Sequence, residues 1–333
     1  MRRLALALML LAGLSAHGRG RSTRLPEVWR TPVCDAWRVG ASFWYVIDNR
    51  AAGLVQSNAA LDGAPREIEV SDVPNLVFAI FDDGIYQSID AGCEWKLRAA
   101  ISGERPRLLA ASGGTAYAWS DSVLIRITRL GEETVSLPDD MITLAADREN
   151  ADRLIAIAPS GAIHASSDGG TTWLRRGAIA GETLRAAAVD PFDFDHVIAA
   201  SDDELWESRD GGVTWMNKPA PAPLTGIAFA AAQQGVVWLV SDGAIYRSMD
   251  DGATFTRVLR SIPMIPLRDS SRLAPHPSHA TTLAFITDNG LGILDLVTNT
   301  TRVAILEPPG SIVWSPTGRL LYATIPQISV PVY

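Results

Sequence analysis

The sequence predicts an all-β fold built from repeated four-stranded antiparallel sheets, and three observations lead to this prediction. A short motif recurs at nearly constant spacing along the 333 residues. Apolar runs and glycine-bearing turns alternate in the same phase between its copies. The segment after the last full unit carries only part of a repeat. Together these features are typical of a chain in which one supersecondary unit is stacked many times.

The recurring motif has the form Ser-x-Asp-x-Gly-x-x-aromatic, and its serines are separated by 78, 42 and 40 residues. A first gap of two periods predicts a worn copy near residue 127, where Gly131 is kept and the serine and aspartate are lost. The period is therefore about 40 residues. The positions that define the four copies are Ser88, Asp90, Gly92 and Trp95; Ser166, Asp168, Gly170 and Trp173; Ser208, Asp210, Gly212 and Trp215; and Ser248, Asp250, Gly252 and Phe255.

The segments around each motif predict the strands. Residues 77–80 form an apolar run that leads through Asp83-Gly84 to Ile85-Tyr86, which is a hairpin signature. A further apolar run lies upstream, as in residues 184–189, and a fourth strand follows the motif, as in residues 173–176. Four short antiparallel strands in about 40 residues predict a β-propeller blade.

The blade count follows from the units at 68–101, 105–138, 139–180, 181–220, 221–260 and 269–306. Residues 311–324 begin a seventh unit, and residues 25–66 are available to supply its outer strands. Sharing one blade between the two ends would leave no exposed inner edge strand. We expect a single propeller domain over residues 19–333 with seven blades, or eight if residues 33–66 form a blade of their own.

The motif has a structural task within the last hairpin of each unit. The Asp carboxylate accepts hydrogen bonds from turn amides, and Gly allows the positive φ of a tight reversal. The aromatic residue covers the blade with a large apolar area. One carboxylate per motif falls far short of the roughly six to eight oxygens that calcium takes. We therefore predict that these residues shape the turn, and we predict no metal site and no cofactor.

The motif resembles the Asp-box, also called the bacterial neuraminidase repeat, over roughly residues 68–306. Proteins that look similar include sialidases, the sortilin ectodomain, cellulose-acting glycosidases with two propellers, and exported propellers of the photosystem II assembly factor type. The resemblance implies that the box lies at the blade periphery, remote from the ligand-binding face. It therefore implies a fold and leaves the reaction open.

The N-terminus predicts export. Arg2 and Arg3 precede an eleven-residue apolar run, Leu4 to Leu14, which is too short to span a membrane of roughly 30 Å as a helix. We interpret residues 1–18 as a signal peptide and expect a periplasmic or extracellular protein with no membrane span in the mature chain. Export permits a disulfide between Cys34 and Cys93, the two cysteines of the chain; the alternative is two separately buried thiols.

The net charge and the available arginine and tyrosine residues limit which classes of function fit the chain. The net charge of −8 argues against a nucleic-acid ligand, which requires a basic face. A sialidase requires an arginine triad and a Tyr nucleophile, and Thr23-Arg24-Leu25-Pro26 matches three of the four positions of the family's first arginine motif. The other two arginines cannot be assigned, and Tyr322 is the one late tyrosine besides the terminal residue. The acidic pairs, such as Asp82-Asp83, lie in predicted turns, where Asp is expected because its side chain hydrogen-bonds to the turn backbone.

Residues 261–280 are the largest departure from the period. The apolar side chains of this insertion are able to contact a partner or to pack on a neighbouring blade, and its His276 and His279 offer with Asp269 a weak metal site or, more simply, a solvated loop. We predict an exported, non-catalytic propeller that acts as a binding or assembly scaffold for a protein or carbohydrate ligand. The alternative is a glycoside hydrolase of sialidase type.

Overall fold

The structure is a computed structural model that describes residues 29, 43–48, 53–58, 65–103, 105–260, 273–305 and 308–324. The predicted signal peptide (residues 1–18), Arg24, Cys34, Asp269 and residues 261–272 of the insertion lie outside the described residues. Within the described part of the chain, no helix is long and apolar enough to cross a membrane.

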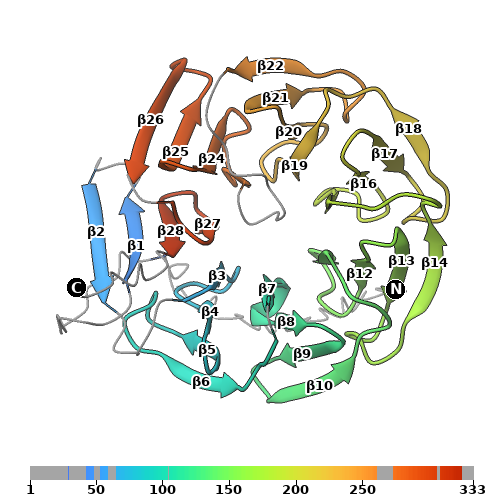
Figure 1. Cartoon of the computed structure of the whole chain (residues 1–333). Coiled ribbons are helices and arrows are strands. Elements are labelled where there is room, and N and C mark those ends of the chain that lie inside the picture. Colours follow the sequence, from blue (N-terminus) through green and yellow to red (C-terminus); the bar gives the residue numbers. More distant parts are fainter. Residues whose placement is uncertain are drawn as a thin grey trace, which may run out of the picture.

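The strands form four-stranded antiparallel sheets that stand around a common centre, as the blades of a propeller do (Figure 1). The predicted all-β propeller with four-stranded antiparallel blades is confirmed. Six of the sheets are each built from four consecutive strands. Short turns join the strands within a blade because each unit is too short for any crossover element.

The first three of these blades cover the chain from residue 67 to residue 178. Their strands are β3 (Glu67–Val70), β4 (Val77–Phe81), β5 (Gly84–Ser88) and β6 (Lys96–Ala99); β7 (Arg107–Ala110), β8 (Ala116–Ser120), β9 (Val123–Ile127) and β10 (Glu132–Ser136); and β11 (Thr143–Ala146), β12 (Leu154–Ile157), β13 (Ala162–Ser166) and β14 (Leu174–Ala178). One 3₁₀ turn, η1 (Ser112–Gly114), joins β7 to β8.

The next three blades run from residue 186 to residue 305. Their strands are β15 (Ala186–Val189), β16 (Val197–Ala200), β17 (Leu205–Ser208) and β18 (Met216–Lys218); β19 (Leu224–Phe229), β20 (Val237–Ser241), β21 (Ala244–Ser248) and β22 (Thr256–Leu259); and β23 (Leu273–Pro275), β24 (Thr282–Thr287), β25 (Gly290–Asp295) and β26 (Thr300–Ile305).

One further sheet combines strands from both ends of the described chain. Its order is β2-β1-β28-β27, formed by β1 (Phe43–Asp48), β2 (Gly53–Asn58), β27 (Ile312–Trp314) and β28 (Leu320–Thr324). Strand β1 pairs with β28 in antiparallel register, with Asp48 opposite Leu320. The N-terminal strands therefore complete a sheet that the C-terminal strands begin.

The hydrophobic core lies between neighbouring blades. The second strand of each blade is buried along its whole length, as in β4, β8, β20 and β24. One core cluster joins Phe78 and Ile80 of β4 to Leu108 of β7 and Ile125 of β9. Because both faces of the second strand are covered, these strands read as continuous apolar runs rather than as alternating patterns.

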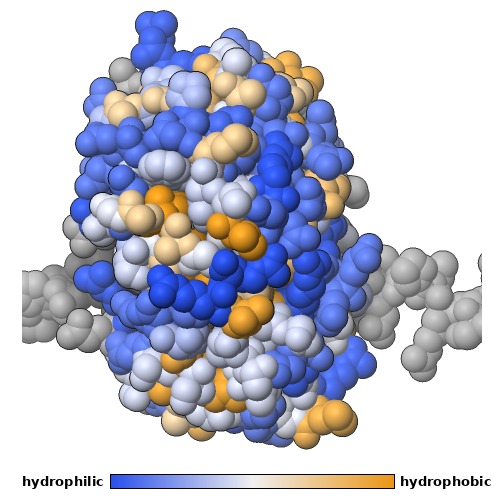
Figure 2. Space-filling view, turned by 90° about the vertical axis from the view of Figure 1, so that its right-hand side faces the viewer, coloured by the Kyte–Doolittle hydropathy of each residue, from blue (hydrophilic) through white to orange (hydrophobic). Residues whose placement is uncertain are grey.

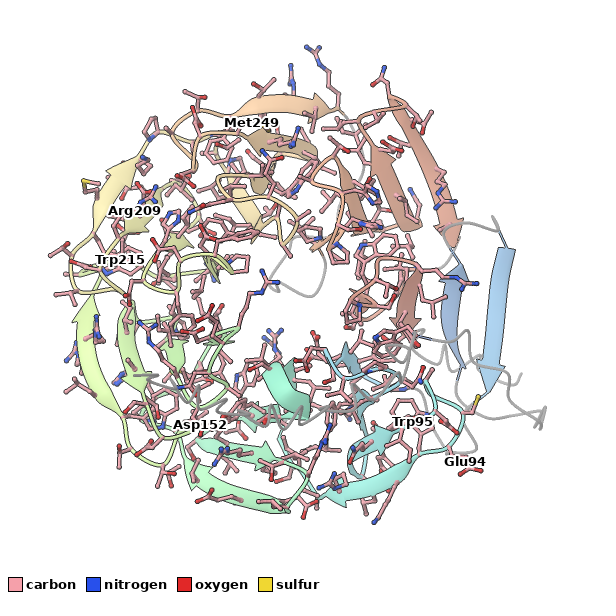
Figure 3. The ribbon with its side chains drawn as sticks, turned by 180° about the vertical axis from the view of Figure 1, so that it is seen from behind. Glu94, Trp95, Asp152, Arg209, Trp215 and Met249 are labelled. Atoms are coloured by element: carbon pink, nitrogen blue, oxygen red, sulfur yellow. The ribbon has the colours of Figure 1, made fainter. Side chains whose placement is uncertain are left out.

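Each motif turn is also hydrogen-bonded to the loop between the first two strands of its blade. The backbone N–H groups of Ala91, Gly169, Gly211 and Asp251 donate to the carbonyl oxygens of Asn75, Asp152, Asp195 and Gly235, respectively, at 2.8 to 2.9 Å. Figure 3 shows the outer turns at the rim, where Glu94, Trp215 and Met249 are labelled. The motif therefore determines the outer hairpin of each blade, whereas the first strands surround the centre of the molecule.

Candidate ligand-binding site in the central cavity

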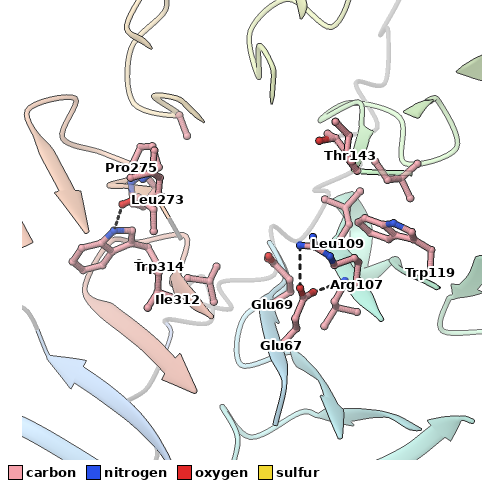
Figure 4. Close-up of a pocket in the computed structure, with 17 residues that line it drawn as sticks. Glu67, Glu69, Arg107, Leu109, Trp119, Thr143, Leu273, Pro275, Ile312 and Trp314 are labelled. Atoms are coloured by element: carbon pink, nitrogen blue, oxygen red, sulfur yellow. Dashed lines mark hydrogen bonds and ion pairs between the residues drawn. The ribbon is translucent and has the colours of Figure 1, made fainter. Parts of the chain in front are cut away.

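The first strands of five blades enclose a cavity of about 310 Å³ near the centre of the molecule (Figure 4). Such a volume lies at the lower end of the range for small-ligand pockets, roughly 300 to 1,000 Å³. The strands that contribute are β3, β7, β11, β23 and β27. Most of the lining is apolar or aromatic, with Leu109, Trp119, Leu273, Ile312 and Trp314 among its residues.

Two carboxylates, Glu67 and Glu69, form the polar wall of this cavity. They lie at alternate positions of β3, so both side chains project from the same face of the strand. Figure 4 shows them pointing into the cavity, across from Ile312 and Trp314. Among the first strands of the described blades, β3 is the one that carries carboxylates.

Glu67 is tied to the neighbouring blade. One of its carboxylate oxygens accepts a hydrogen bond from the Leu108 backbone N–H at 2.6 Å, and the other lies 3.6 Å from Arg107 Nη1. Burial raises the pKa of Glu67 to about 7, although the Arg107 charge and the Leu108 N–H both act to lower it. This carboxylate therefore joins β3 to β7 across the blade boundary.

Glu69 has a different environment. Burial and the nearby charge of Glu67 raise its pKa to about 8, and the Val70 backbone N–H opposes them only weakly. Within the described residues, no side chain forms an ion pair or a hydrogen bond with its carboxylate. Of the two carboxylates, Glu67 is therefore anchored by described residues and Glu69 is not.

The aromatic part of the lining is fixed in place. Trp314 Nε1 donates to the Ala274 carbonyl oxygen at 2.9 Å, and Trp119 Nε1 donates to the Met141 carbonyl oxygen at 3.4 Å. The indole N–H groups are therefore already occupied, and the rings offer apolar surface and π-electron density to a ligand.

The motif residues lie away from this cavity and satisfy one another. In the third copy, the Ser208 hydroxyl donates to Asp210 Oδ1 and accepts from the Gly212 N–H, both at 2.8 Å. The Thr214 N–H and hydroxyl donate to Asp210 at 2.9 and 2.6 Å. The aromatic residues Trp95, Trp173, Trp215 and Phe255 each pack against a different core cluster.

These hydrogen bonds shape the acidity of the turns. Bonds from the threonine hydroxyl and from other turn donors lower the pKa of Asp168, Asp210 and Asp250 to about 2 in each case. A carboxylate that is held ionised by four local donors is suited to fixing a loop. It is poorly suited to proton transfer near neutral pH.

Several residues singled out in the sequence have structural surroundings of their own. His276 is buried, its Nε2 lies 2.9 Å from the Gly318 carbonyl oxygen, and its Nδ1 accepts from the Ser278 N–H at 3.2 Å. Burial and the neighbouring His279 lower the pKa of His276 to about 4. The ring is therefore neutral and used at both nitrogens, which fits a role in packing the β27–β28 turn.

Tyr322 and the cysteines complete the predicted set. Tyr322 is fully buried, its hydroxyl donates to the Ala91 carbonyl oxygen at 3.3 Å, and burial raises its pKa well above the ordinary value. It does not line the cavity. No cysteine in the described part of the chain is a free thiol. Because Cys34 lies outside that part, its pairing with Cys93 stays a prediction.

A buried polar network between two blades was missed by sequence reasoning. His196 Nδ1 lies 3.0 Å from Asp190 Oδ2, and its Nε2 lies 3.1 Å from Glu207 Oε1 without the alignment of a hydrogen bond. Asp190, His196 and Asp251 offer ligand atoms within 4.8 Å of one another. Arg209 contacts both Glu207 and Asp251, at 2.6 and 3.4 Å, so the chain itself supplies the positive charge here.

The outer surface shows no concentrated apolar patch on the side seen in Figure 2. The exposed apolar side chains of the outer strands include Leu174 of β14 and Met216 of β18, which are 67% and 59% exposed. Figure 2 shows such groups separated by hydrophilic ones. Isolated exposed apolar residues are normal on soluble proteins and do not mark a docking site.

Comparisons with known proteins support the propeller fold but do not assign the chain to a family. No family model matches the chain. The chain is 29% identical over 289 residues to the Dispase autolysis-inducing protein of Streptomyces mobaraensis, covering 77% of this chain and 76% of that protein.

Solved structures with the same fold include YCF48 bound to D1 peptide, with 14% identity and a TM-score of 0.61 over 89% of this chain and all of that one. Virginiamycin B lyase from Staphylococcus aureus has 15% identity and a TM-score of 0.59, covering 79% and 94% of the two chains. A GH74 enzyme from Niastella koreensis has 19% identity and a TM-score of 0.54, covering 79% of this chain and 43% of its own.

Proposed function

We propose that this chain is an exported, non-catalytic propeller of seven Asp-box-type blades whose central cavity contributes to binding a protein partner. The observation that carries the proposal is the wall formed by Glu67 and Glu69, because it is a strongly polar feature that faces the central cavity and that the repeat does not explain. A feature that breaks an internal repeat at the centre of a rigid scaffold is where a propeller would carry its specificity.

Two relatives support a protein partner over a carbohydrate. The Streptomyces protein is named for inducing the autolysis of dispase, so its name describes an action on another protein. The YCF48 structure holds a peptide, which supports peptide binding as a task that this fold is able to perform. A protease of the dispase kind is therefore the first partner to test.

The test uses the purified mature chain and purified dispase. Binding is measured by isothermal titration with dispase inhibited, and autolysis is followed on gels with active dispase in the presence and absence of the chain. We expect a complex at micromolar concentrations and faster loss of intact dispase. If neither binding nor accelerated autolysis is detected, dispase is not the partner and the support from the relative is lost.

A second candidate function, glycoside hydrolysis, rests on the same two carboxylates. The raised pKa values of Glu67 and Glu69 suit a group that donates a proton near neutral pH. The sialidase form has less support, because Arg107 is the one guanidinium among the described residues that line the cavity and Tyr322 is buried elsewhere. Arg24 lies outside the described residues.

Hydrolysis assays separate the two candidates. We expect the purified chain to leave fluorogenic sialosides and fluorogenic β-glycosides intact. Turnover that is abolished by Glu67→Gln or Glu69→Gln would replace the binding proposal with the hydrolase. Turnover that survives both substitutions would point to a contaminating enzyme and would be removed by further purification.

Export and the disulfide belong to the same proposal. We expect the secreted chain to begin at residue 17 or 19 and its mass to rise by two hydrogen masses on reduction, as a Cys34–Cys93 bond requires. Mass spectrometry of the chain recovered from the exported fraction measures both. Retention of the leader in that fraction would contradict cleavage of the signal peptide.

A further inference from the structure

Within the part of the chain that the structure describes, Glu69 is the carboxylate of the cavity that lacks a compensating charge. Arg107 is the cation closest to this wall in the described residues, and it is directed at Glu67. Figure 4 shows Glu69 projecting from β3 toward the open side of the cavity rather than toward β7. No other basic side chain of the described residues lines the cavity.

An uncompensated carboxylate in such a place costs stability. Removing a charged group from water is unfavourable unless an opposite charge or several hydrogen bonds replace the water. The rise in the pKa of Glu69 to about 8 expresses that cost, since burial and Glu67 disfavour its ionised form. Strongly perturbed groups that face a cavity are typical of binding sites, where a ligand completes the environment.

The remaining walls specify what accompanies the positive charge. Leu109, Leu273 and Ile312 offer aliphatic surface, which suits a hydrocarbon stem rather than a hydrated ion. Trp119 and Trp314 add aromatic surface on which a cation is attracted to the π-electrons. A divalent metal would require roughly six or more oxygen ligands, and this wall offers two carboxylates, one of them already bonded.

We propose that the central cavity binds the guanidinium or ammonium group of an arginine or lysine side chain, with Glu69 as its counter-ion and the apolar walls around its stem. The assignment rests on the proposed function in that the side chain is presented by the protein partner. It adds the chemistry by which that partner is recognised: a basic residue that enters the cavity end first.

The binding test uses a small probe and its neutral isostere. Nα-acetyl-arginine amide and Nα-acetyl-citrulline amide have nearly the same shape, but only the first is charged. We expect the purified chain to bind the arginine probe at least about tenfold more tightly than the citrulline probe, by titration calorimetry, since a charge-assisted hydrogen bond is roughly twice as strong as a neutral one in a desolvated site.

The pH dependence of binding gives a second readout. The guanidinium stays charged at every accessible pH, so a change in affinity reports the ionisation of the cavity. With a pKa of about 8, Glu69 is mostly protonated at low pH and mostly ionised at high pH. We expect the affinity for the arginine probe to rise by roughly tenfold or more between about pH 6 and pH 9, and the citrulline affinity to change little.

The variants are Glu69→Gln and, as a matched control, Asp203→Asn, which neutralises an exposed carboxylate outside the cavity. Glu69→Gln should lose arginine binding and its pH dependence while melting no lower than the wild type, which shows that it folds. Asp203→Asn should bind as the wild type does. Equal binding of the two probes, retention of arginine binding by Glu69→Gln, or no arginine binding at millimolar concentration each overturns the inference.

Dispase binding by the same variants separates this inference from the proposed function. If dispase binds wild type and Glu69→Gln equally, the basic side chain does not enter this cavity and the inference fails while protein binding stands. If the arginine probe binds through Glu69 but dispase does not bind, the cavity assignment stands and the proposed partner fails.

Discussion

The carboxylates of the outer turns and those of the central cavity are held in opposite states by the same fold. At the rim, Asp168, Asp210 and Asp250 accept several hydrogen bonds and their pKa values fall to about 2. At the centre, burial raises the pKa values of Glu67 and Glu69 to about 7 and about 8. The rim carboxylates are repeated from blade to blade, whereas the central ones occur in β3 alone among the first strands.

This difference separates structural from functional charge. A carboxylate surrounded by donors stabilises the turn that contains it, so its presence in several blades is explained by folding. A carboxylate that faces a cavity with too few donors opposes folding at neutral pH. Among the described residues nothing compensates Glu69, which is the argument for a ligand at the centre.

The largest expected effect comes from breaking a rim turn at its buried member. Ser208→Ala removes the hydroxyl that donates to Asp210 and accepts from the Gly212 N–H, and Ser208 is only 1% exposed. Because it leaves a buried N–H without a partner, we expect a loss of about 1 to 3 kcal/mol in the free energy of unfolding. Denaturant titration measures it.

Ser136→Ala is the matched control for that change. Ser136 is an exposed residue of β10, in the blade whose motif copy is worn. We expect its midpoint to stay within the error of the wild type. If Ser208→Ala also leaves the denaturant midpoint unchanged, the hydrogen bonds of the rim turn do not stabilise the blade. The rim carboxylates would then not have the structural role assigned to them.

A smaller effect of opposite sign is expected at the centre. The pKa of Glu69 is about 8 in the folded state and 4.5 ordinarily. Between about pH 4.5 and pH 8, the folded state therefore keeps a proton on Glu69 that the unfolded state has lost. The contribution to stability is therefore complete below about pH 4.5 and is lost as the pH rises through 8. The full pKa shift corresponds to roughly 5 kcal/mol. Because Glu69 is only partly buried, solvent screens much of this, and we expect Glu69→Gln to stabilise the protein by about 1 to 2 kcal/mol at about pH 9.

The pH profile of the difference between wild type and Glu69→Gln is the informative measurement. It should shrink steadily from about pH 9 toward pH 5 as wild-type Glu69 becomes protonated. The rim behaves in the reverse sense, because carboxylates with pKa values of about 2 stabilise the fold above about pH 4 and lose that effect as the pH falls through 2. A wild type less stable than Glu69→Gln by the same amount at every pH would contradict the assigned ionisation.

The rim was accessible to sequence reasoning because it depends on neighbours in sequence. Ser208, Asp210 and Thr214 bond to one another within seven residues, and the pattern is repeated, so both the turn and its spacing are visible in the chain. The blade boundaries were accessible for the same reason. The second strands are also recognisable in the sequence as apolar runs, because both of their faces are buried in the structure.

The cavity was not predicted because its members meet only across blades. Glu67 contacts Leu108 from the next unit, and Trp314 lies across the cavity from β3. The available signal was the Glu-Ile-Glu pattern of residues 67–69, because the first strands of the other described blades carry no carboxylate. The network of His196 was missed although Asp190 lies in the same loop, because Glu207 lies on β17 and Asp251 comes from the motif turn of the next blade.

The smallest expected effect sharpens the rim side of the comparison by repair rather than by damage. The first motif copy has Glu94 where the other three have Thr172, Thr214 and Thr254. Asp90 accordingly accepts bonds from Ser88 and from the Cys93 and Glu94 N–H groups but lacks the threonine hydroxyl that the others receive. Glu94 is exposed, so replacing it disturbs no core contact.

Glu94→Thr should therefore stabilise the first blade, since it adds one hydrogen bond to Asp90 and removes a neighbouring negative charge. We expect a gain of about 0.5 to 1 kcal/mol, measured as a rise in the denaturant midpoint. The reciprocal change, Thr214→Val, should cost about the same because it deletes that bond from the third copy. If both substitutions leave the midpoint unchanged, the threonine hydroxyl contributes nothing to the turn, and the low pKa of Asp210 must then arise from the backbone and serine donors alone.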